Sequence, residues 1–410
     1  MSVVKPTVEE IRSIAKQCNL SLSDEDLAIY QELMAGALES YHRLNELVEP
    51  KLPVNTPRNP GYRPSLEENK LGAWYWKTSI KSGKEGPLSG KTIVLKDNVC
   101  LAGVPMMNGS AALEGYIPDV DATIVTRILD AGGEIVGKSV CEDLCFSGGS
   151  HTSYTGPVRN PHNPEHMAGG SSSGSAALVA NGDVDMAIGS DTGGSVRIPS
   201  SWCGIVGLKP TYGLVPGTGV FPMELTLDHV GPMAKTTGDV ALLLSVIAGE
   251  DGLDFRQKGV PKKDYLEALN RDAGNLRIGI VKEGFQWEGI SEPDVNEIVM
   301  KSAKRFKEIG ARVSEISIPA HHDGIHIWNG IAIEGVMSLM LRGNSTGTNW
   351  KGYYPTSLLD VYSRGLKDRA NDLSPTVKMS YILGLYMEKN YNGRFYAKAQ
   401  NLSRTLTKAY

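Results

Sequence analysis

The feature that most constrains this chain is a segment dense in glycine and serine between Gly169 and Thr211. It reads Gly-Gly-Ser-Ser-Ser-Gly-Ser-Ala-Ala at its start and Asp-Thr-Gly-Gly-Ser-Val-Arg-Ile-Pro-Ser from Asp191. Glycine lets backbone N–H groups approach a reacting atom, and serine hydroxyls can attack a carbonyl carbon or relay a proton. A flexible linker is also rich in these residues, but it lacks apolar blocks such as those beginning at Ala176 and Met186. The segment therefore predicts an oxyanion pocket with a nucleophile in it.

The composition narrows the function classes. The chain has 410 residues, a net charge of −4 and 41% hydrophobic residues, as is typical of soluble globular proteins. Because there is no basic excess, we expect no nucleic-acid partner. The N-terminus has no apolar leader, and no apolar run approaches the length of a membrane span. We therefore expect a cytoplasmic protein that does not bind membranes.

The cysteines argue against a disulfide framework and against a metal site. There are five, an odd number, in a long chain without an export signal, so we expect reduced thiols. Cys141 and Cys145 are four residues apart and could share a helix face, but no second pair or histidine cluster completes a zinc site. The sequence predicts neither a metal nor a cofactor.

Two helices are expected at the N-terminus. Apolar residues recur at helical spacing over residues 8–18, and Ser23 with Asp26 has the pattern of a capping box. The helix that follows carries an apolar stripe made of Leu27, Tyr30, Leu33, Met34, Leu38, Tyr41 and Leu44. That stripe can pack on the rest of the chain or on a second copy, so a homodimer through these helices is one expectation.

Prolines divide this helical region from a larger body. Four of them fall within residues 51–64, which predicts a break in regular structure. We therefore expect an N-terminal helical region over 1–50, a proline-rich linker over 51–68 and a main domain over 69–410.

The main domain alternates strand and helix patterns, which predicts an α/β fold, an α/β/α sandwich around one mixed β-sheet. Strands are expected at 92–96, 134–137, 186–190, 276–281 and 312–316. Helices are expected at 122–131, 174–181, 237–248 and 294–309, and a further one at 397–410.

The Gly/Ser segment resembles the defining segment of the amidase signature family, hydrolases that use a Ser–cis-Ser–Lys triad. The resemblance covers about Trp74 to Gly252 and includes the run Thr-Ile-Val-Leu-Lys-Asp-Asn. It implies that Ser195 is the nucleophile, that Ser171 is the bridging serine after a cis peptide bond, and that Lys96 is the base. Within the family, the runs Pro-Met-Met-Asn-Gly-Ser and Cys-Glu-Asp-Leu-Cys-Phe-Ser are most similar to the amidases linked to nitrile hydratases.

A serine nucleophile needs a base, and no histidine lies within the two Gly/Ser runs. A lysine can serve when its amine is neutral. Spacing alone also fits a lysine that reaches solvent from the strand end, and the family resemblance at all three positions decides for Lys96 as the base. The resemblance further implies that backbone N–H groups of Thr192, Gly193, Gly194 and the nucleophile form the oxyanion hole.

Neighbouring residues have simpler interpretations. Asp191 and Arg197 are expected to hold the loop by charge, and Ser172 and Ser173 to cap the helix that follows them. Gly-Ser-Ser-Ser-Gly also matches the nucleophile elbow of α/β-hydrolases, centred on Ser172, but the loop-like residues before it do not fit the strand that an elbow requires.

Two aromatic residues are candidates for substrate binding. Phe146 follows the Cys-Glu-Asp-Leu-Cys run, which lines the cleft in the family, and Trp328 lies in an apolar stretch with Ile325 and Ile327. Both also fit a place in the hydrophobic core.

The resemblance implies an amidase that hydrolyses small carboxylic amides to the acid and ammonia. Two alternatives stay open: a glutaminase subunit of an amidotransferase, and a truncated inactive homologue. The second arises because Tyr410 falls in an expected helix while members of the family run further, so we expect the family's C-terminal part to be missing. An exposed sheet edge and a marginally stable or self-associating chain are then expected.

Overall fold

The computed structural model describes residues 3–261 and 263–410. The chain forms two compact units, the first ending at Leu52 and the second beginning at Pro53. The first unit consists of helices α1 (Val8–Gln17) and α2 (Asp24–Glu46). The predicted capping box of α2 is confirmed, because the Ser23 hydroxyl accepts from the Asp26 N–H and the Asp26 carboxylate accepts from the Ser23 N–H, both at 3.1 Å.

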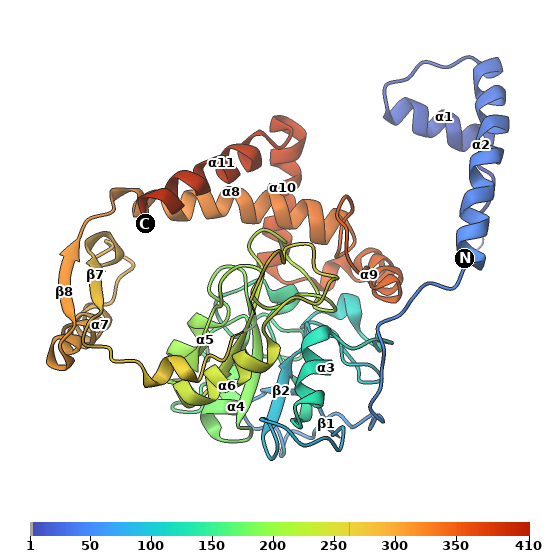
Figure 1. The fold of residues 1–410 in the computed structure, drawn as a ribbon. Helices are drawn as coiled ribbons and strands as arrows, with labels where there is room; N and C mark the ends of the chain where they lie inside the picture. Colours follow the sequence, from blue (N-terminus) through green and yellow to red (C-terminus); the bar gives the residue numbers. More distant parts are fainter. Residues whose placement is uncertain (1–2, 262) are drawn as a thin grey trace. The chain divides into compact units, whose positions relative to one another are not determined.

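A six-stranded mixed sheet forms the centre of the second unit (Figure 1). Its strands are β1 (Trp74–Ile80), β2 (Thr92–Lys96), β3 (Glu134–Ser139), β4 (Met186–Asp191), β5 (Val206–Gly207) and β6 (His229–Ala234). In space they follow the order β1-β3-β2-β4-β6-β5. The three strands β3, β2 and β4 are parallel neighbours, and the outer pairings are antiparallel. The strands expected at 92–96, 134–137 and 186–190 are confirmed.

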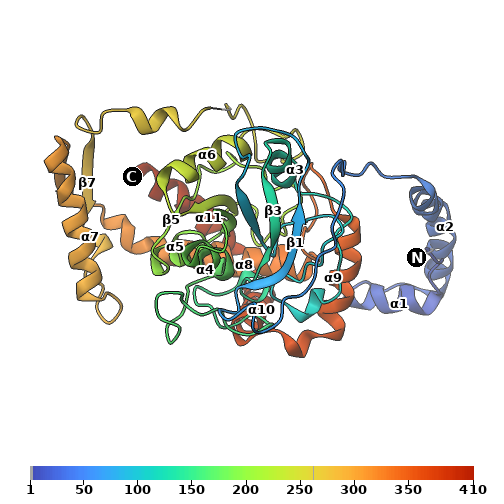
Figure 2. The same cartoon turned by 90° about the horizontal axis from the view of Figure 1, so that it is seen from below.

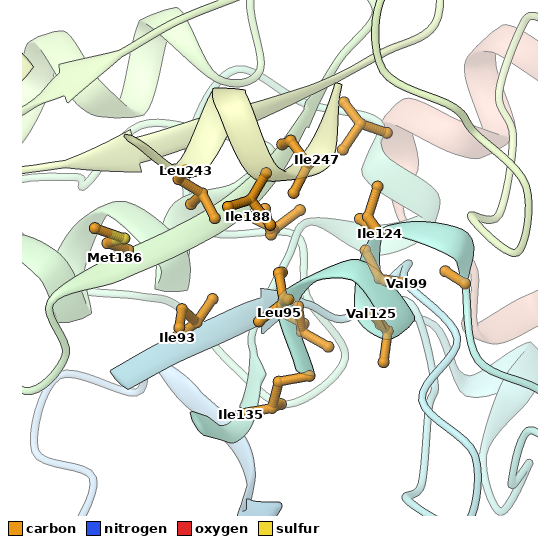
Figure 3. Close-up of a cluster of buried hydrophobic side chains, with 14 of the residues drawn as sticks. Ile93, Leu95, Val99, Ile124, Val125, Ile135, Met186, Ile188, Leu243 and Ile247 are labelled. Atoms are coloured by element: carbon orange, nitrogen blue, oxygen red, sulfur yellow. The ribbon is translucent and has the colours of Figure 1, made fainter. Parts of the chain in front are cut away.

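Helices cover the sheet because its central strands carry continuous apolar runs that are buried on both faces. Ile93 and Leu95 of β2 and Ile188 of β4 share one buried cluster with α3 (Thr123–Asp130) and α6 (Thr237–Ile247) (Figure 3). The helix α4 (Ser173–Asn181) packs against β2, β3, β4 and β6. The predicted α/β class, with helices packed around a mixed sheet, is confirmed.

The strands expected at 276–281 and 312–316 exist but do not join this sheet. Strands β7 (Arg277–Val281) and β8 (Arg312–Ile316) pair in parallel with each other, next to α7 (Pro293–Arg305) (Figure 2). Ile280 is the one residue of these two strands that is buried. The expectation of one sheet is wrong here, because a pair so exposed has little apolar surface to bury against the central sheet.

The remaining helices lie mostly in the C-terminal third. They are α5 (Arg197–Trp202), α8 (Gly324–Val336), α9 (Thr356–Asp368), α10 (Pro375–Tyr391) and α11 (Arg394–Ala409). Helices α8 and α11 run side by side (Figure 1). Short 3₁₀ turns occur at Ala111–Leu113, Asp143–Cys145, Glu267–Asn270, Lys282–Gly284, Phe306–Ile309, Pro319–Asp323 and Ala370–Asp372, and a π-helical turn at Met337–Arg342.

One stretch differs from the expectation that no segment has the length of a membrane span. By length and composition alone, the segment Pro319–Arg342 is long and apolar enough to cross a membrane. However, 44% of its apolar window is buried inside the protein. Core helices pass the same test, and Ile331, Val336 and Met340 are buried. The finding is weak evidence for a membrane span.

Part of the predicted linker packs against the sheet. The carbonyl of Asn59 accepts from the Thr78 hydroxyl at 2.6 Å, and that of Pro60 accepts from Trp76 Nε1 at 2.7 Å. Tyr62 forms a bridge with Lys77. The segment from Asn59 therefore belongs with β1, whereas the domain bounds at 50 and 68 stay a prediction.

Candidate active site

Two parallel strands bring the candidate residues to one edge of the sheet. Lys96 is the last residue of β2, and Asp191 is the last residue of the neighbouring strand β4. Parallel strands end at the same sheet edge, where loops gather functional side chains. The Gly/Ser loop that begins at Asp191 therefore starts beside Lys96.

Lys96 is fully buried, and uncharged oxygens surround its amine. Its Nζ donates to the Oγ of Ser171 and to the Oγ of Ser190, both at 2.8 Å, and the Ser190 carbonyl lies 3.4 Å away. Asn98 Nδ2 donates to the same Ser190 Oγ at 3.1 Å. The amine is thus held between two serine hydroxyls.

The adjacent carboxylate does not neutralise Lys96. Asp97 forms an ion pair with Lys138 at 3.0 Å, and both side chains are buried. Its other oxygen accepts two backbone N–H groups, from Met107 at 2.9 Å and from Asn108 at 2.8 Å. Burial raises the pKa of Asp97, while Lys138 and these N–H groups act in the opposite direction. In the described chain Lys96 has no ion-pair partner.

Ser171 follows a cis peptide bond with Gly170, as the family resemblance implies. The site leaves no room for a side chain at position 170, because a Cβ there would lie 2.3 Å from the Gly149 carbonyl oxygen. The Ser171 carbonyl accepts from the Glu142 N–H at 3.2 Å. These contacts hold the Ser171 hydroxyl against Lys96.

Ser195 lies on the loop after β4 and is half-buried. Its carbonyl accepts from the N–H of Ser172 at 3.3 Å, which ties the loop to the Ser171 segment. No hydrogen bond among the described residues joins the Ser195 hydroxyl to that of Ser171. The structure therefore brings Lys96 and Ser171 into direct contact and places Ser195 on the adjoining loop.

Asp191 organises that loop. Its carboxylate accepts from the N–H groups of Gly194 at 2.8 Å and Val196 at 3.2 Å, and it pairs with the Arg197 guanidinium at 3.0 Å. Burial alone would raise the pKa of Asp191, but Arg197 and the N–H donors hold it below its usual value. Asp191 and Arg197 thus hold the loop, as expected from the sequence.

This arrangement changes the expected oxyanion hole. The Gly194 N–H donates to Asp191 and is therefore not available to a substrate. The structure thus corrects the expectation that Gly194 is one of the oxyanion donors. No hydrogen bond among the described residues uses the N–H of Thr192, Gly193 or Ser195. The Thr192 hydroxyl donates to Asp228 at 2.6 Å, which leaves its N–H unused. The N–H groups of Thr192, Gly193 and Ser195 are the donors left for a reacting oxygen.

Trp328 of α8 reaches this loop. Its Nε1 donates to the Thr192 carbonyl at 3.1 Å, and a Cβ on Gly193 would lie 2.5 Å from its ring. Phe146 is partly buried, and its carbonyl accepts from the Thr376 hydroxyl at 3.0 Å. A substrate-binding role for either aromatic residue stays a prediction.

The expected roles of Ser172 and Ser173 are wrong. Ser172 occupies the cap position of α4 but makes no capping bond, and its hydroxyl bonds to the backbone of Ser190 at 3.3 Å. The Ser173 hydroxyl is buried without a partner. Because Ser172 is fully buried and engaged, the nucleophile-elbow interpretation also fails.

A cavity of about 50 Å³ lies on the Ser190 side of the site. Its lining includes Asn98, Ser190, Thr192, Phe221, Asp228 and Trp350. The Oδ1 atom of Asn98 is buried there without a hydrogen-bond partner. Burial raises the pKa of Asp228, although Thr192 and backbone N–H groups oppose that change.

Sequence reasoning missed Ser190, Asn98 and this cavity. The sequence did contain a signal for them, since polar residues at the carboxyl end of a buried parallel strand commonly face a site.

Over residues 3–261 and 263–410, no three His, Cys, Asp or Glu side chains gather as metal ligands.

Known proteins resemble this chain. The family model for Amidase matches residues 59–410. An enantioselective amidase of Rhodococcus rhodochrous is 46% identical over 92% of this chain and 74% of that protein. One of the subunits of the glutamyl-tRNA(Gln) amidotransferase of Methanosarcina acetivorans is 38% identical over 85% of this chain and 74% of its own length. The structure of a peptide amidase from Stenotrophomonas maltophilia matches this chain with a TM-score of 0.66 and 28% sequence identity. The match covers 78% of this chain and 66% of the peptide amidase, just under two thirds of its length.

Proposed function

This chain belongs to the Amidase family and is by that membership a hydrolase of amide C–N bonds, and we propose that it converts small carboxylic amides to the acid and ammonia through an acyl-enzyme on Ser195. The observation that carries the proposal is the 2.8 Å hydrogen bond from Lys96 Nζ to Ser171 Oγ. A buried amine in contact with one hydroxyl can draw a proton through it from a second hydroxyl. The Ser195 loop, which the hydrogen bond from the Ser172 N–H to the Ser195 carbonyl ties to the Ser171 segment, supports the same assignment.

The proposed acylation begins with attack of Ser195 Oγ on the amide carbon. The Ser195 proton passes to Ser171 Oγ as the Ser171 proton passes to a neutral Lys96. The N–H groups of Thr192, Gly193 and Ser195 are the donors that stabilise the oxyanion, and one such donor typically contributes about 3–4 kcal/mol in the transition state. Ser171 then protonates the leaving nitrogen, and the Lys96 proton restores Ser171. In deacylation a water molecule replaces Ser195 as the nucleophile.

Substitution of Ser195 tests this proposal directly. Ser195→Ala should abolish amide turnover and labelling by a fluorophosphonate probe, which bonds covalently to an activated serine. Ser201→Ala is the matched control, because Ser201 is an exposed serine of α5 a few residues away. Full labelling of Ser195→Ala would overturn the assignment. Labelling of the unmodified chain without turnover of any amide would favour an inactive homologue.

A glutaminase subunit is the second candidate, and the identity to the amidotransferase component favours it. Such a protein uses the same triad but passes ammonia to a partner. The purified chain should hydrolyse benzamide if it is a self-contained amidase. Turnover of glutamine alone would favour the glutaminase.

Two further proposals concern the cellular location and the oligomeric state of the enzyme. We propose a cytoplasmic protein that forms a homodimer through α1 and α2, supported by the exposed apolar residues Leu33 and Leu44 of α2. Leu33→Glu with Leu44→Glu should then give a monomer by light scattering, whereas the polar substitution Glu39→Gln should not. Cell fractionation tests the location.

A further inference from the structure

A cavity of about 910 Å³ lies apart from the candidate catalytic residues. Its lining comes from helices α8, α10 and α11, from the π-helical turn after α8 and from the loop before β6. Neither Lys96 nor Ser171 nor Ser195 is among the described residues that line it. A space of this size accommodates a small organic molecule.

Glu334 of α8 is a buried residue of this lining. It is 5% exposed, and its Oε2 atom has no hydrogen-bond partner among the described residues. Burial raises the pKa of Glu334, whereas the backbone of Tyr396 lowers it. A buried carboxylate is costly unless a donor or a cation satisfies it. Glu334 can therefore accept a hydrogen bond from a ligand in the cavity.

A second carboxylate, that of Glu224, lies against the same turn of α8. A Cβ on Gly335, the residue after Glu334, would lie 2.5 Å from Glu224 Cγ. Glu224 is 4% exposed, and its two oxygens accept from the Tyr396 hydroxyl at 3.0 Å and from the Thr226 N–H at 2.8 Å. These donors are neutral, so they fix the position of the Glu224 carboxylate without compensating a negative charge.

The lining is acidic overall. Its described residues include three glutamates, and Arg342 is the one cationic residue among them. Arg342 forms an ion pair with Glu388, the third glutamate. This pair leaves the carboxylates of Glu224 and Glu334 without a cationic partner in the described lining. The charge of the cavity therefore fits a positively charged ligand.

Aromatic rings complete the lining. Phe255 and Trp350 both line the cavity, and their ring centroids are 5.4 Å apart. Tyr396, whose hydroxyl donates to Glu224, is a third aromatic residue there. Aromatic faces attract organic cations, whereas a metal ion such as calcium takes more oxygen ligands than two carboxylates supply. The lining therefore favours an organic ammonium group over a metal ion.

We propose that this cavity binds a primary amine in its ammonium form. The ammonium group donates to the carboxylates of Glu334 and Glu224, and the apolar body of the amine packs against Phe255 and Trp350. A neutral molecule of the same shape leaves both carboxylates uncompensated and binds more weakly. The proposal goes beyond amide hydrolysis and does not depend on it, because the triad residues lie outside the described lining.

Titration calorimetry of the full chain with benzylamine tests the proposal. At about pH 8 an alkylamine is protonated and a carboxyl group in water is ionised. Benzyl alcohol has the same ring without the charge, so we expect benzylamine to bind at least about tenfold more tightly. Glu334→Gln keeps the shape of the side chain but removes its charge, and it should weaken benzylamine binding at least about tenfold. Phe255→Leu removes an aromatic face and should weaken it about twofold to fivefold.

Glu308→Gln is the matched control, since it makes the same exchange at an exposed glutamate outside the described lining, and it should leave the affinity unchanged. Equal affinities for the two probes, unchanged binding in Glu334→Gln or no binding of benzylamine to the unmodified chain would overturn the proposal. Thermal unfolding shows whether Glu334→Gln is folded. If it is not, Phe255→Leu decides, because Phe255 is 47% exposed and its replacement should be tolerated. Unchanged binding in that variant would then overturn the proposal.

Discussion

The Nζ atom of Lys96 lies 2.8 Å from the Oγ atom of Ser190, the same distance that separates it from Ser171 Oγ. Ser190 belongs to β4, and Asn98 holds its hydroxyl with a hydrogen bond of 3.1 Å. Lys96 is therefore oriented by a serine on the neighbouring strand as well as by its proposed proton partner. A lysine side chain has four rotatable bonds, so a second anchor limits the positions of its amine.

Ser190→Ala tests this second anchor. Without the hydroxyl, the amine of Lys96 keeps one well-placed hydrogen bond, and we expect kcat to fall about 10-fold to 100-fold with little change in KM. Steady-state kinetics on benzamide measure the effect. Ser175→Ala is a suitable control, because the Ser175 hydroxyl is buried under the same sheet and bonds to Ile188 rather than to Lys96. Equal losses in both variants would point to a packing effect.

Lys96→Arg should be inactive at every accessible pH, because a guanidinium group stays protonated and cannot accept the relayed proton. Lys91→Arg makes the same change just before β2, where Lys91 pairs with Asp239 at 2.9 Å, and should keep full activity. Retention of more than a few per cent of turnover in Lys96→Arg would exclude lysine as the base.

The carboxylate of Asp191 should make the free energy of unfolding depend on pH. Asp191 has a folded-state pKa below its usual value, so its contribution is present above the unfolded pKa of about 3.9 and is lost as the pH falls through the folded value. Asp191→Asn should lower the free energy of unfolding at pH 7 by about 2 kcal/mol, allowing for the half-exposed Arg197. The difference should shrink below about pH 4. Denaturant unfolding at pH 7 and pH 3.5 measures it, with the exposed Asp323→Asn as control. A deficit that did not change with pH would contradict this prediction.

Gly193→Ala should reduce kcat/KM about 10-fold or more, because the new methyl group would lie 2.5 Å from the Trp328 ring and displace the N–H donors of the loop. Adding Trp328→Ala should recover part of the loss by removing the clash. Gly36→Ala is the control, since no atom lies within 4 Å of its added methyl group. A double variant as poor as the single one would show that the ring is not the obstacle.

The strands that carry the site could be predicted, because apolar runs end in polar residues at Lys96 and Asp191. The role of each residue came from the family motif rather than from spacing. Strand β6 was missed because Gly231 and Pro232 normally weaken a strand. In the structure Pro232 lies opposite Ile188, between β4 and the two-residue edge strand β5.

The contacts around Lys96 were harder to predict from the sequence than the strands. Cys141 and Cys145 could be read as one helix face, but they meet at Asn108 because Leu144 and Cys145 adopt left-handed conformations. A single sequence does not reveal such conformations in residues other than glycine or asparagine. The use of the Gly194 N–H by Asp191 likewise depends on the path of the loop.

The hydrogen bonds that hold the Lys96 amine connect distant parts of the chain, 75 residues away at Ser171 and 94 residues away at Ser190. Parallel strands such as β2 and β4 cannot pair until the chain between them has crossed over, and contacts so far apart in sequence form slowly. A nascent chain that has not yet added β4 therefore has no assembled base. Recovery of amide turnover during refolding would time the docking of these two strands, whereas recovery of helical signal would not.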